Sequence, residues 1–223
     1  MVPQLLDRGA TELCRADQPG RGCRGDGQPA SRPLPAREML FFFYDAEAFG
    51  WGFEPEDRHG QRVFFFDGPM EELTPTPAPT GIDVYEPRSL TFVAATELPD
   101  VTSDLVDPDL DDDEYDTYLD LVENHELSLD TKLLGHSNNV QEGMELTCEL
   151  ASRGISAGTS ESRRDVGAEV REGARHWRLL LQVDSDDHTG MTWGANEGCL
   201  YFWIREDDLA HGRFERSWQT LQT

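Results

Sequence analysis

Residues 39–44 read Met-Leu-Phe-Phe-Phe-Tyr and residues 199–204 read Cys-Leu-Tyr-Phe-Trp-Ile, and these two stretches carry the strongest structural signal in the sequence. They match at a fixed offset, so that Phe42 corresponds to Phe202 and aromatic residues flank it on both sides in each stretch. A continuous aromatic run of this length predicts a strand with both faces covered. The match predicts an internal duplication, in which each of two lobes contains one of these strands.

Apolar runs between turn signals predict further strands at 61–67, 89–96, 176–184 and 214–221. Helical spacing of apolar residues predicts an acidic amphipathic helix from about 110 to 124. A second short helix is expected over 141–150. Residues 151–175, which are rich in Gly, Ser, Arg and Glu, are expected to form a mobile insert.

Composition divides the chain into an arm and a domain. Residues 1–37 are rich in Gly, Arg and Pro and cannot bury enough apolar area to order themselves. They are expected to be a disordered arm or the product of a wrongly assigned start upstream of the domain. A single domain is expected over 38–223, with lobe one at about 38–96 and lobe two at about 127–223. The acidic connector between the lobes, at about 97–126, holds 13 acids and no Lys or Arg.

The charge balance is strongly acidic, with 44 Asp and Glu against 19 Lys and Arg and a formal net charge of -25. Such a surface repels phosphate backbones and anionic membranes, so neither nucleic acid nor a membrane is expected as a partner. A basic protein is the partner that the electrostatics favour. The alternative is that the charge only keeps the protein soluble.

The spacing of the cysteines and the hydropathy of the chain indicate the cellular compartment. The four cysteines form no CxxC pair and match neither zinc-site nor disulfide-scaffold spacing. Cys199 lies in an apolar run and is expected to be a small buried hydrophobe. Neither a secretory signal nor an apolar run long enough to span a bilayer is recognised. These features predict a cytoplasmic protein with reduced thiols.

Short motifs are spread over residues 38–220: Leu40-Phe-Phe-Phe-Tyr-Asp45, Trp51-Gly-Phe53, Leu133-Leu-Gly-His136, Leu179-Leu-Leu-Gln-Val-Asp-Ser-Asp186, Trp193-Gly194, Leu200-Tyr-Phe202 and Asp208-Leu209. Together they resemble the signature of the YwqG-like bacterial proteins, a family of unknown function. The resemblance implies an α+β fold, internally duplicated into two lobes, with a largely antiparallel β-sheet and a few short helices. Members usually carry a further strand before the first aromatic strand. Here the arm occupies that region, which predicts an open sheet edge or an exposed apolar strip in lobe one.

Several polar residues are candidates for a site. Gln182, Asp184 and Asp186 interrupt or follow an apolar strand, and a polar residue buried there must find a partner. The aspartates and His188 could hold a divalent cation, or the aspartates could cap a hairpin turn. His136 could carry a proton in a cleft between the lobes, or it could be a hydrogen-bonded structural histidine.

Trp51 and Trp193 each neighbour a glycine and could anchor a ligand or partner, or could cap the core from a tight turn. Two motif matches are weak. Gly154-Ile-Ser-Ala-Gly158 fits G-x-S-x-G but has polar flanks, and the alternating aspartates from Asp107 lack the Gly and Glu of a calcium loop. No Walker loop, Rossmann fingerprint or HExxH motif is present, so no cofactor and no metal are expected.

Three functions remain open from the sequence. The leading hypothesis is a non-enzymatic protein-binding module, of immunity type, that engages a basic partner. The second is an enzyme whose site lies in the cleft between the lobes and is built from Gln182, Asp184, Asp186 and His136. The third is a small-molecule or cation sensor at such a cleft.

Overall fold

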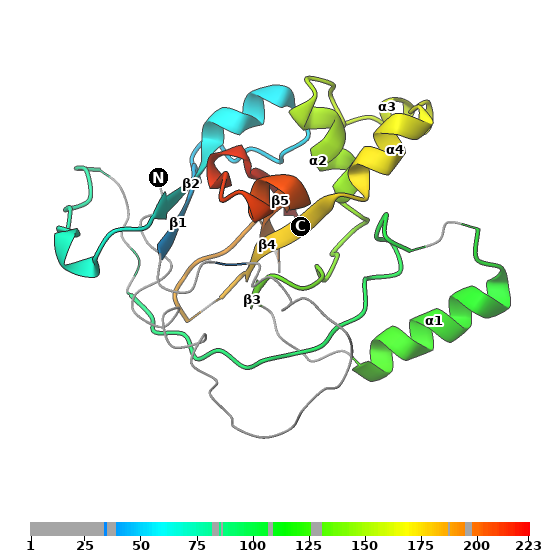
Figure 1. Ribbon diagram of the computed structural model, residues 1–223, viewed down its shortest axis with the longest axis horizontal. Coiled ribbons are helices and arrows are strands. Elements are labelled where there is room, and N and C mark those ends of the chain that lie inside the picture. The colour runs from blue at the N-terminus through cyan, green and yellow to red at the C-terminus, as the bar shows by residue number, and fades with distance from the viewer. Residues whose placement is uncertain are drawn as a thin grey trace.

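Two antiparallel sheets lie at the centre of the molecule (Figure 1). The computed structural model describes residues 39–81, 87–106, 109–125, 131–186, 188–194 and 198–223, together with Leu34 and Tyr85. The predicted arm, apart from Leu34, lies outside these residues. The smaller sheet pairs β1 (Met39–Tyr44) with β2 (Gln61–Phe66). The larger sheet has the order β3 (Lys132–Leu133), β4 (Trp177–Asp184), β5 (Cys199–Arg205) and β6 (Trp218–Gln222).

Short helices connect and cover these strands. The α-helices are α1 (Asp112–His125), α2 (Glu145–Ser152), α3 (Ser160–Arg164), α4 (Ala168–Ala174) and α5 (Glu206–Ala210). The 3₁₀ helices are η1 (Pro55–Gly60), η2 (Met70–Glu72) and η3 (Phe214–Arg216). The α+β class is therefore confirmed, and α1 and α2 overlap the helices expected over about 110–124 and over 141–150.

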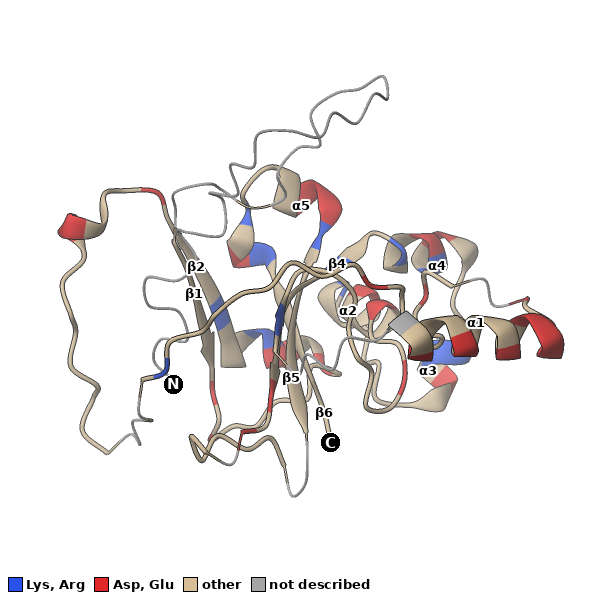
Figure 2. Cartoon of the chain, turned by 90° about the horizontal axis from the view of Figure 1, so that it is seen from below, with Lys and Arg blue, Asp and Glu red and all other residues tan. Residues whose placement is uncertain are grey.

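The larger sheet is the middle of three layers, between the smaller sheet and helix α2 (Figure 2). Side chains of β5 alternate between the two interfaces, because successive residues of a strand point to opposite faces. Tyr201 and Trp203 pack in the cluster with α2, whereas Phe202 packs in the cluster with the smaller sheet. The Phe202 and Phe42 rings meet edge to face with centroids 5.1 Å apart. The two aromatic stretches thus pack against each other, and β5 has both faces covered.

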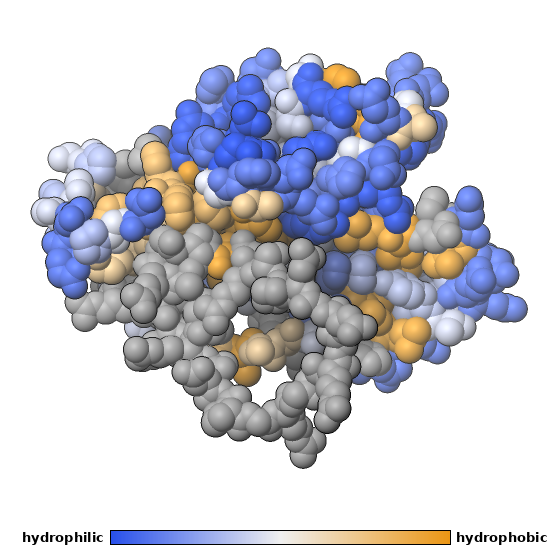
Figure 3. Space-filling model, in the orientation of Figure 1, coloured by the Kyte–Doolittle hydropathy of each residue, from blue (hydrophilic) through white to orange (hydrophobic). Residues whose placement is uncertain are grey.

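The first aromatic strand differs from this expectation on its outer face. Phe42 and Tyr44 of β1 are buried, but Phe41 and Phe43 are only half-buried. The neighbouring Phe64 of β2 is 54% exposed, and Figure 3 shows hydrophobic residues at the surface in this part of the molecule. The expectation that both faces are covered is therefore wrong for β1, while an exposed apolar strip in lobe one agrees with the structure. Because β1 lies in a two-stranded sheet and β5 in a four-stranded sheet, the internal duplication stays a prediction.

Two local predictions are wrong. Residues 89–96 form no strand, and Val93 among them is 70% exposed. Residues 151–175 contain α3 and α4. Thr159 caps α3 through its side chain, and Ala174 packs with residues of α2, so this segment has a core of its own.

A β-bulge redirects β4. The register with β5 shifts between Leu179 and Leu181. As a result Leu179 packs on the α2 side, whereas Leu181 and Val183 pack on the side of the smaller sheet. Gln182 is then opposite Tyr201, on the α2 side.

The loop after β1 runs along β6. The backbone N–H of Leu221 donates to the carbonyl of Trp51 over 3.2 Å, and the indole N–H of Trp218 donates to the carbonyl of Gly52 over 2.9 Å. Gly52 has a φ of +83°, and a Cβ there would lie 2.0 Å from the carbonyl oxygen of Gln219. This position therefore requires glycine for both its backbone conformation and the close approach to β6.

We expect Gly52→Ala to lower the free energy of unfolding by about 2–3 kcal/mol, because the left-handed conformation costs an L-residue about 1–2 kcal/mol and the loop must also move away from β6. Gly154→Ala is a matched control, since Gly154 has a φ of +85° but open space around it. Urea denaturation of both variants measures the difference. Equal losses would contradict the close approach of the loop to β6.

Candidate functional site

A cleft of about 400 Å³ lies between the two parts of the chain that the sequence assigns to separate lobes. One wall comes from η1 and β2, and the other comes from the larger sheet with α5 and η3. Its lining residues are Arg58, His59, Gln61, Arg62, Ser152, Trp177, Arg205, Asp208, Glu215, Arg216, Ser217 and Trp218. In Figure 2, segments with Lys and Arg lie on β2 and around α5, two of the elements that supply lining residues.

Two tryptophans form platforms for two of the arginines. The guanidinium of Arg58 lies 5.8 Å from the ring centroid of Trp218, and that of Arg205 lies 5.7 Å from the ring of Trp177. Both rings are buried. The negative face of an indole ring attracts a cation, so these contacts hold the two guanidinium groups in defined places.

Glu149 is the buried counter-ion behind the cleft. Its carboxylate is fully buried and accepts hydrogen bonds from Arg153 at 2.7 Å, from the indole N–H of Trp177 at 2.9 Å and from Arg205. Gly173 of α4 allows this arrangement, since a Cβ there would lie 2.0 Å from a Glu149 carboxylate oxygen. Arg205 is therefore anchored by charge as well as by its contact with Trp177.

The other charges of the cleft are unevenly paired. Asp208 is buried and pairs with Arg213 at 2.5 Å and with Arg216 at 3.5 Å. Arg62 donates to the backbone carbonyls of Arg58 and Gln61, at 3.2 and 3.1 Å. Within the described parts of the chain, neither Arg58 nor Arg62 forms an ion pair.

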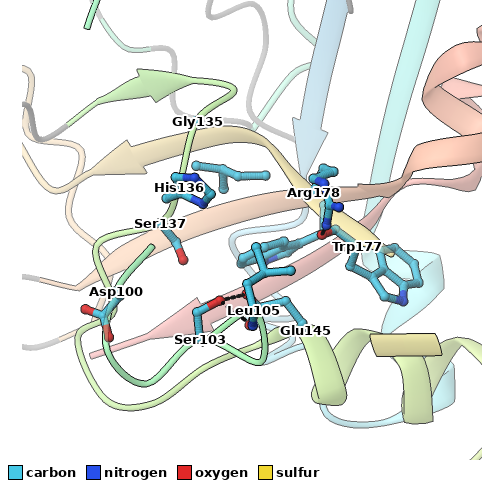
Figure 4. A pocket seen from close by; sticks show the side chains of 11 residues that line it. Asp100, Ser103, Leu105, Gly135, His136, Ser137, Glu145, Trp177 and Arg178 are labelled. Atoms are coloured by element: carbon cyan, nitrogen blue, oxygen red, sulfur yellow. Dashed lines mark hydrogen bonds between the residues drawn. The ribbon is translucent and has the colours of Figure 1, made fainter. Parts of the chain in front are cut away.

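His136 lines a second, much smaller cavity of about 10 Å³ (Figure 4). The Ser103 hydroxyl donates to the buried carboxylate of Glu145, which also lines this cavity. Burial raises the pKa of Glu145 and lowers the pKa of His136, because it disfavours the charged form of each group. The volume is that of about one water molecule, which excludes an organic substrate from this cavity as it stands.

The backbone of His136 is held by an ion pair. Lys132 lies 2.8 Å from Glu97, donates to the carbonyl of His136 at 3.1 Å, and contacts the side chain of Asn138. The loop that carries His136 is thereby fixed to β3.

The remaining polar candidates lie elsewhere. Gln182 is buried and accepts a hydrogen bond from the backbone N–H of Asn138 at 3.0 Å, which links β4 to the loop after His136. Asp184 accepts from the backbone N–H of Ser185 at 2.8 Å. Asp186 accepts from the backbone N–H of His188 at 2.9 Å, within the hairpin turn. The cavity that His136 lines includes none of these three residues.

The two tryptophan candidates have different surroundings. Trp193 is buried, and its ring meets Tyr44 edge to face with centroids 5.7 Å apart. Trp51 is 38% exposed and stacks on Phe53 at a centroid distance of 6.5 Å. Trp193 is thus part of the core, whereas Trp51 lies at the surface.

Other chemistry is limited among the described residues. Cys148 and Cys199 are free and buried, and burial, together with the charge of Asp184, raises the pKa of Cys199 to about 12. Neither thiol is activated as a nucleophile at neutral pH. In these parts of the chain no group of three or more His, Cys, Asp or Glu side chains is placed to hold a metal ion. The helices described here include none that is long and apolar enough to cross a membrane.

The sequence matches one family model, described as a domain of unknown function (DUF1963), over residues 26–223. The chain belongs to the DUF1963 family. The match begins within the arm that composition assigned to residues 1–37. No curated protein matches the chain. The DUF1963 assignment names an uncharacterised domain, so the arginine cleft and the small cavity are the features from which a function must be argued.

The sequence did not point to the arginines of this DUF1963 domain. Arg58 and Arg62 are about 150 positions from Arg205 and Arg216, and each resembles an ordinary surface charge. One signal was present, since Arg58 and Arg62 are four residues apart at the start of an expected strand in a strongly acidic chain.

Proposed function

We propose that the protein is a non-enzymatic binding protein that engages a basic protein partner, and that α1 is the element that docks. The main support for the proposal is the charge and the exposure of α1. It holds six acids and no Lys or Arg, and none of its residues with described side chains is buried. Figure 1 shows α1 extending away from the two sheets.

The apolar side of α1 supports docking into a groove. Tyr115, Leu119 and Val122 lie at spacings of four and three residues and so share one face of the helix. Tyr115 is exposed and the other two are half-buried. An amphipathic helix with such a face is a common ligand for an apolar groove in a partner protein.

The charge of α1 favours a basic partner. Like charges at this density weaken an isolated helix, and a cationic surface would relieve their repulsion. Opposite charge also steers the encounter and increases the association rate. The hydroxyl of Tyr118 donates to the carbonyl of Pro99 at 2.9 Å, which ties α1 to the preceding connector.

The finer features of the proposal rest on the sequence. They are the YwqG-like resemblance with its bacterial source, an immunity-type role in which the acidic surface masks a basic toxin, and a cytoplasmic location. The enzyme hypothesis has less support, because the small cavity that His136 lines does not include Gln182, Asp184 or Asp186.

A pull-down with the full chain as bait tests the proposal. We expect a basic protein to be retained at about 50 mM salt and lost at about 500 mM, because salt screens exposed charges. A variant with Asp112, Asp113, Asp116 and Asp120 changed to Asn should retain at least about tenfold less. Asp111 is kept, because its carboxylate accepts from the Glu114 N–H at the start of α1.

The control neutralises an equal number of exposed acids elsewhere, at Glu47, Asp67, Glu71 and Glu72. It has the same net charge as the α1 variant, so it separates the helix from the overall charge. Equal loss in both variants would show that no docking element exists, and the absence of any partner at low salt would contradict the proposal.

A further inference from the structure

We propose that the cleft lined by Arg58, Arg62, Arg205 and Arg216 binds a small organic anion, namely a phosphate or carboxylate compound that also carries hydroxyl groups. This site is separate from α1, and it does not depend on the proposed protein partner. It is also unlike the cation site that the sequence suggested, because four arginines and only two acids, Asp208 and Glu215, line it.

The charged side chains of the cleft are the first reason to expect an anion there. The chain has 44 acids and 19 basic residues, so an arginine on its surface has many carboxylates with which to pair. Arg205 pairs with Glu149, and Arg216 lies 3.5 Å from Asp208. Arg58 and Arg62 form no ion pair within the described residues, although they line a concave surface. Planar guanidinium groups that have no carboxylate partner bind oxyanions through paired N–H donors.

The positions of the arginines are fixed before any ligand arrives. Trp218 lies under Arg58, Trp177 lies under Arg205, and the buried Glu149 holds Arg205 from behind. The guanidinium of Arg62 is bonded to two backbone carbonyls. Groups held in place in this way lose little freedom when they bind, which favours affinity.

Gln61 provides an independent observation. Its side chain lines the cleft, is 5% exposed, and donates through Nε2 to the carbonyl of Ser217 at 2.7 Å. Its Oε1 atom is buried and accepts no hydrogen bond from any described residue. A buried acceptor of this kind is paired in most structures. A ligand hydroxyl is a suitable donor, whereas a carboxylate ion without hydroxyl groups has none to offer.

The size of the cleft limits the ligand. A volume of about 400 Å³ lies within the range of small-molecule sites and fits a compound of sugar-phosphate size. The oxyanion would lie between Arg58 and Arg62, and a small movement of the Gln61 side chain would let its Oε1 accept from a hydroxyl of the same molecule. Guanidinium groups bind both phosphates and carboxylates, so both enter the test.

Isothermal titration calorimetry of the full chain tests the proposal with four probes: ribose 5-phosphate, gluconate, inorganic phosphate and ribose. We expect at least one of the two hydroxylated anions to bind, inorganic phosphate to bind more weakly, and ribose not to bind. The tighter binder of the two, ribose 5-phosphate or gluconate, shows whether the site prefers a phosphate or a carboxylate. No heat with either hydroxylated anion at about 10 mM, or equal binding of ribose, would overturn the proposal.

Variants locate the binding. Arg58→Gln with Arg62→Gln should weaken the bound anion at least about tenfold, and both side chains are exposed, so folding should persist. Arg171→Gln is the matched control, since Arg171 is exposed on α4 and does not line the cleft. Gln61→Met should reduce the affinity of the hydroxylated anion to that of inorganic phosphate, while retained phosphate binding reports an intact cleft. Unchanged affinity in the double arginine variant would refute this site.

Discussion

Glu149→Ala should lower the free energy of unfolding by about 2–4 kcal/mol, because it removes a fully buried carboxylate that pairs with two half-buried arginines and accepts from a buried indole N–H. The Glu149 carboxylate is fully buried and accepts from Arg153, Arg205 and the indole of Trp177. Its loss leaves the buried Trp177 N–H without an acceptor and Arg205 without its counter-ion. The expected loss is large against the total stability of a domain this size, which is about 5–15 kcal/mol.

Equilibrium unfolding in urea measures this loss, and Glu149→Gln refines it. The amide keeps an oxygen that can accept from Trp177 but carries no charge, so a smaller loss than for Ala is expected. Glu169→Ala is the matched control. Glu169 lies 3.3 Å from the same Arg153, but its side chain is 87% exposed, and such a pair contributes about 0–1 kcal/mol. A Glu149→Ala variant as stable as the control would show that Glu149 does not organise the larger sheet and α2.

The sequence predicted an element correctly where its pattern of apolar residues matches the burial of those residues in the structure. Every residue of β5 except the last is buried, so an unbroken apolar run was sufficient to place it in the middle layer. The same pattern in β1 was misleading, because coverage of the second face depends on what the rest of the chain supplies there. The prediction for residues 89–96 failed as well, because an apolar run becomes a strand only where the tertiary context gives it a partner strand.

The arginine cleft could not be found from the sequence because it depends on contacts across the chain. Pairing of β2 with β1 and packing of β2 against η3 bring Arg62 and Arg216 to one cleft. Nothing in the sequence marks these side chains as neighbours. By contrast, the polar residues that interrupt β4 were conspicuous, yet Gln182 bonds to the backbone N–H of Asn138. The polar residues that were easy to notice in the β4 sequence therefore form structural hydrogen bonds. The arginines of the cleft, by contrast, could not be recognised as a cluster from the sequence.

Phe202→Ala should lower the free energy of unfolding by about 3–5 kcal/mol, because the deletion of a buried phenyl ring loses transfer free energy and leaves a cavity. Phe202 lies between the two sheets with its ring centroid 5.1 Å from that of Phe42. This pair joins the two aromatic stretches, so its interaction energy reports directly on the packing of one sheet against the other. Thermal or urea unfolding of the variant provides the measurement.

A double-mutant cycle with Phe42→Leu and Phe202→Leu isolates the pair, since leucine removes the ring contact with less risk of unfolding the chain. An edge-to-face pair in this geometry should show a coupling energy of about 0.5–1.5 kcal/mol. The comparison cycle uses Phe43 and Phe64, which also meet edge to face, at 5.5 Å, but on the outer side of the smaller sheet. That pair is partly solvated and should couple more weakly. Zero coupling between Phe42 and Phe202 would mean that the smaller sheet does not pack on β5 as described, and the cleft between them would then lose its framework as well.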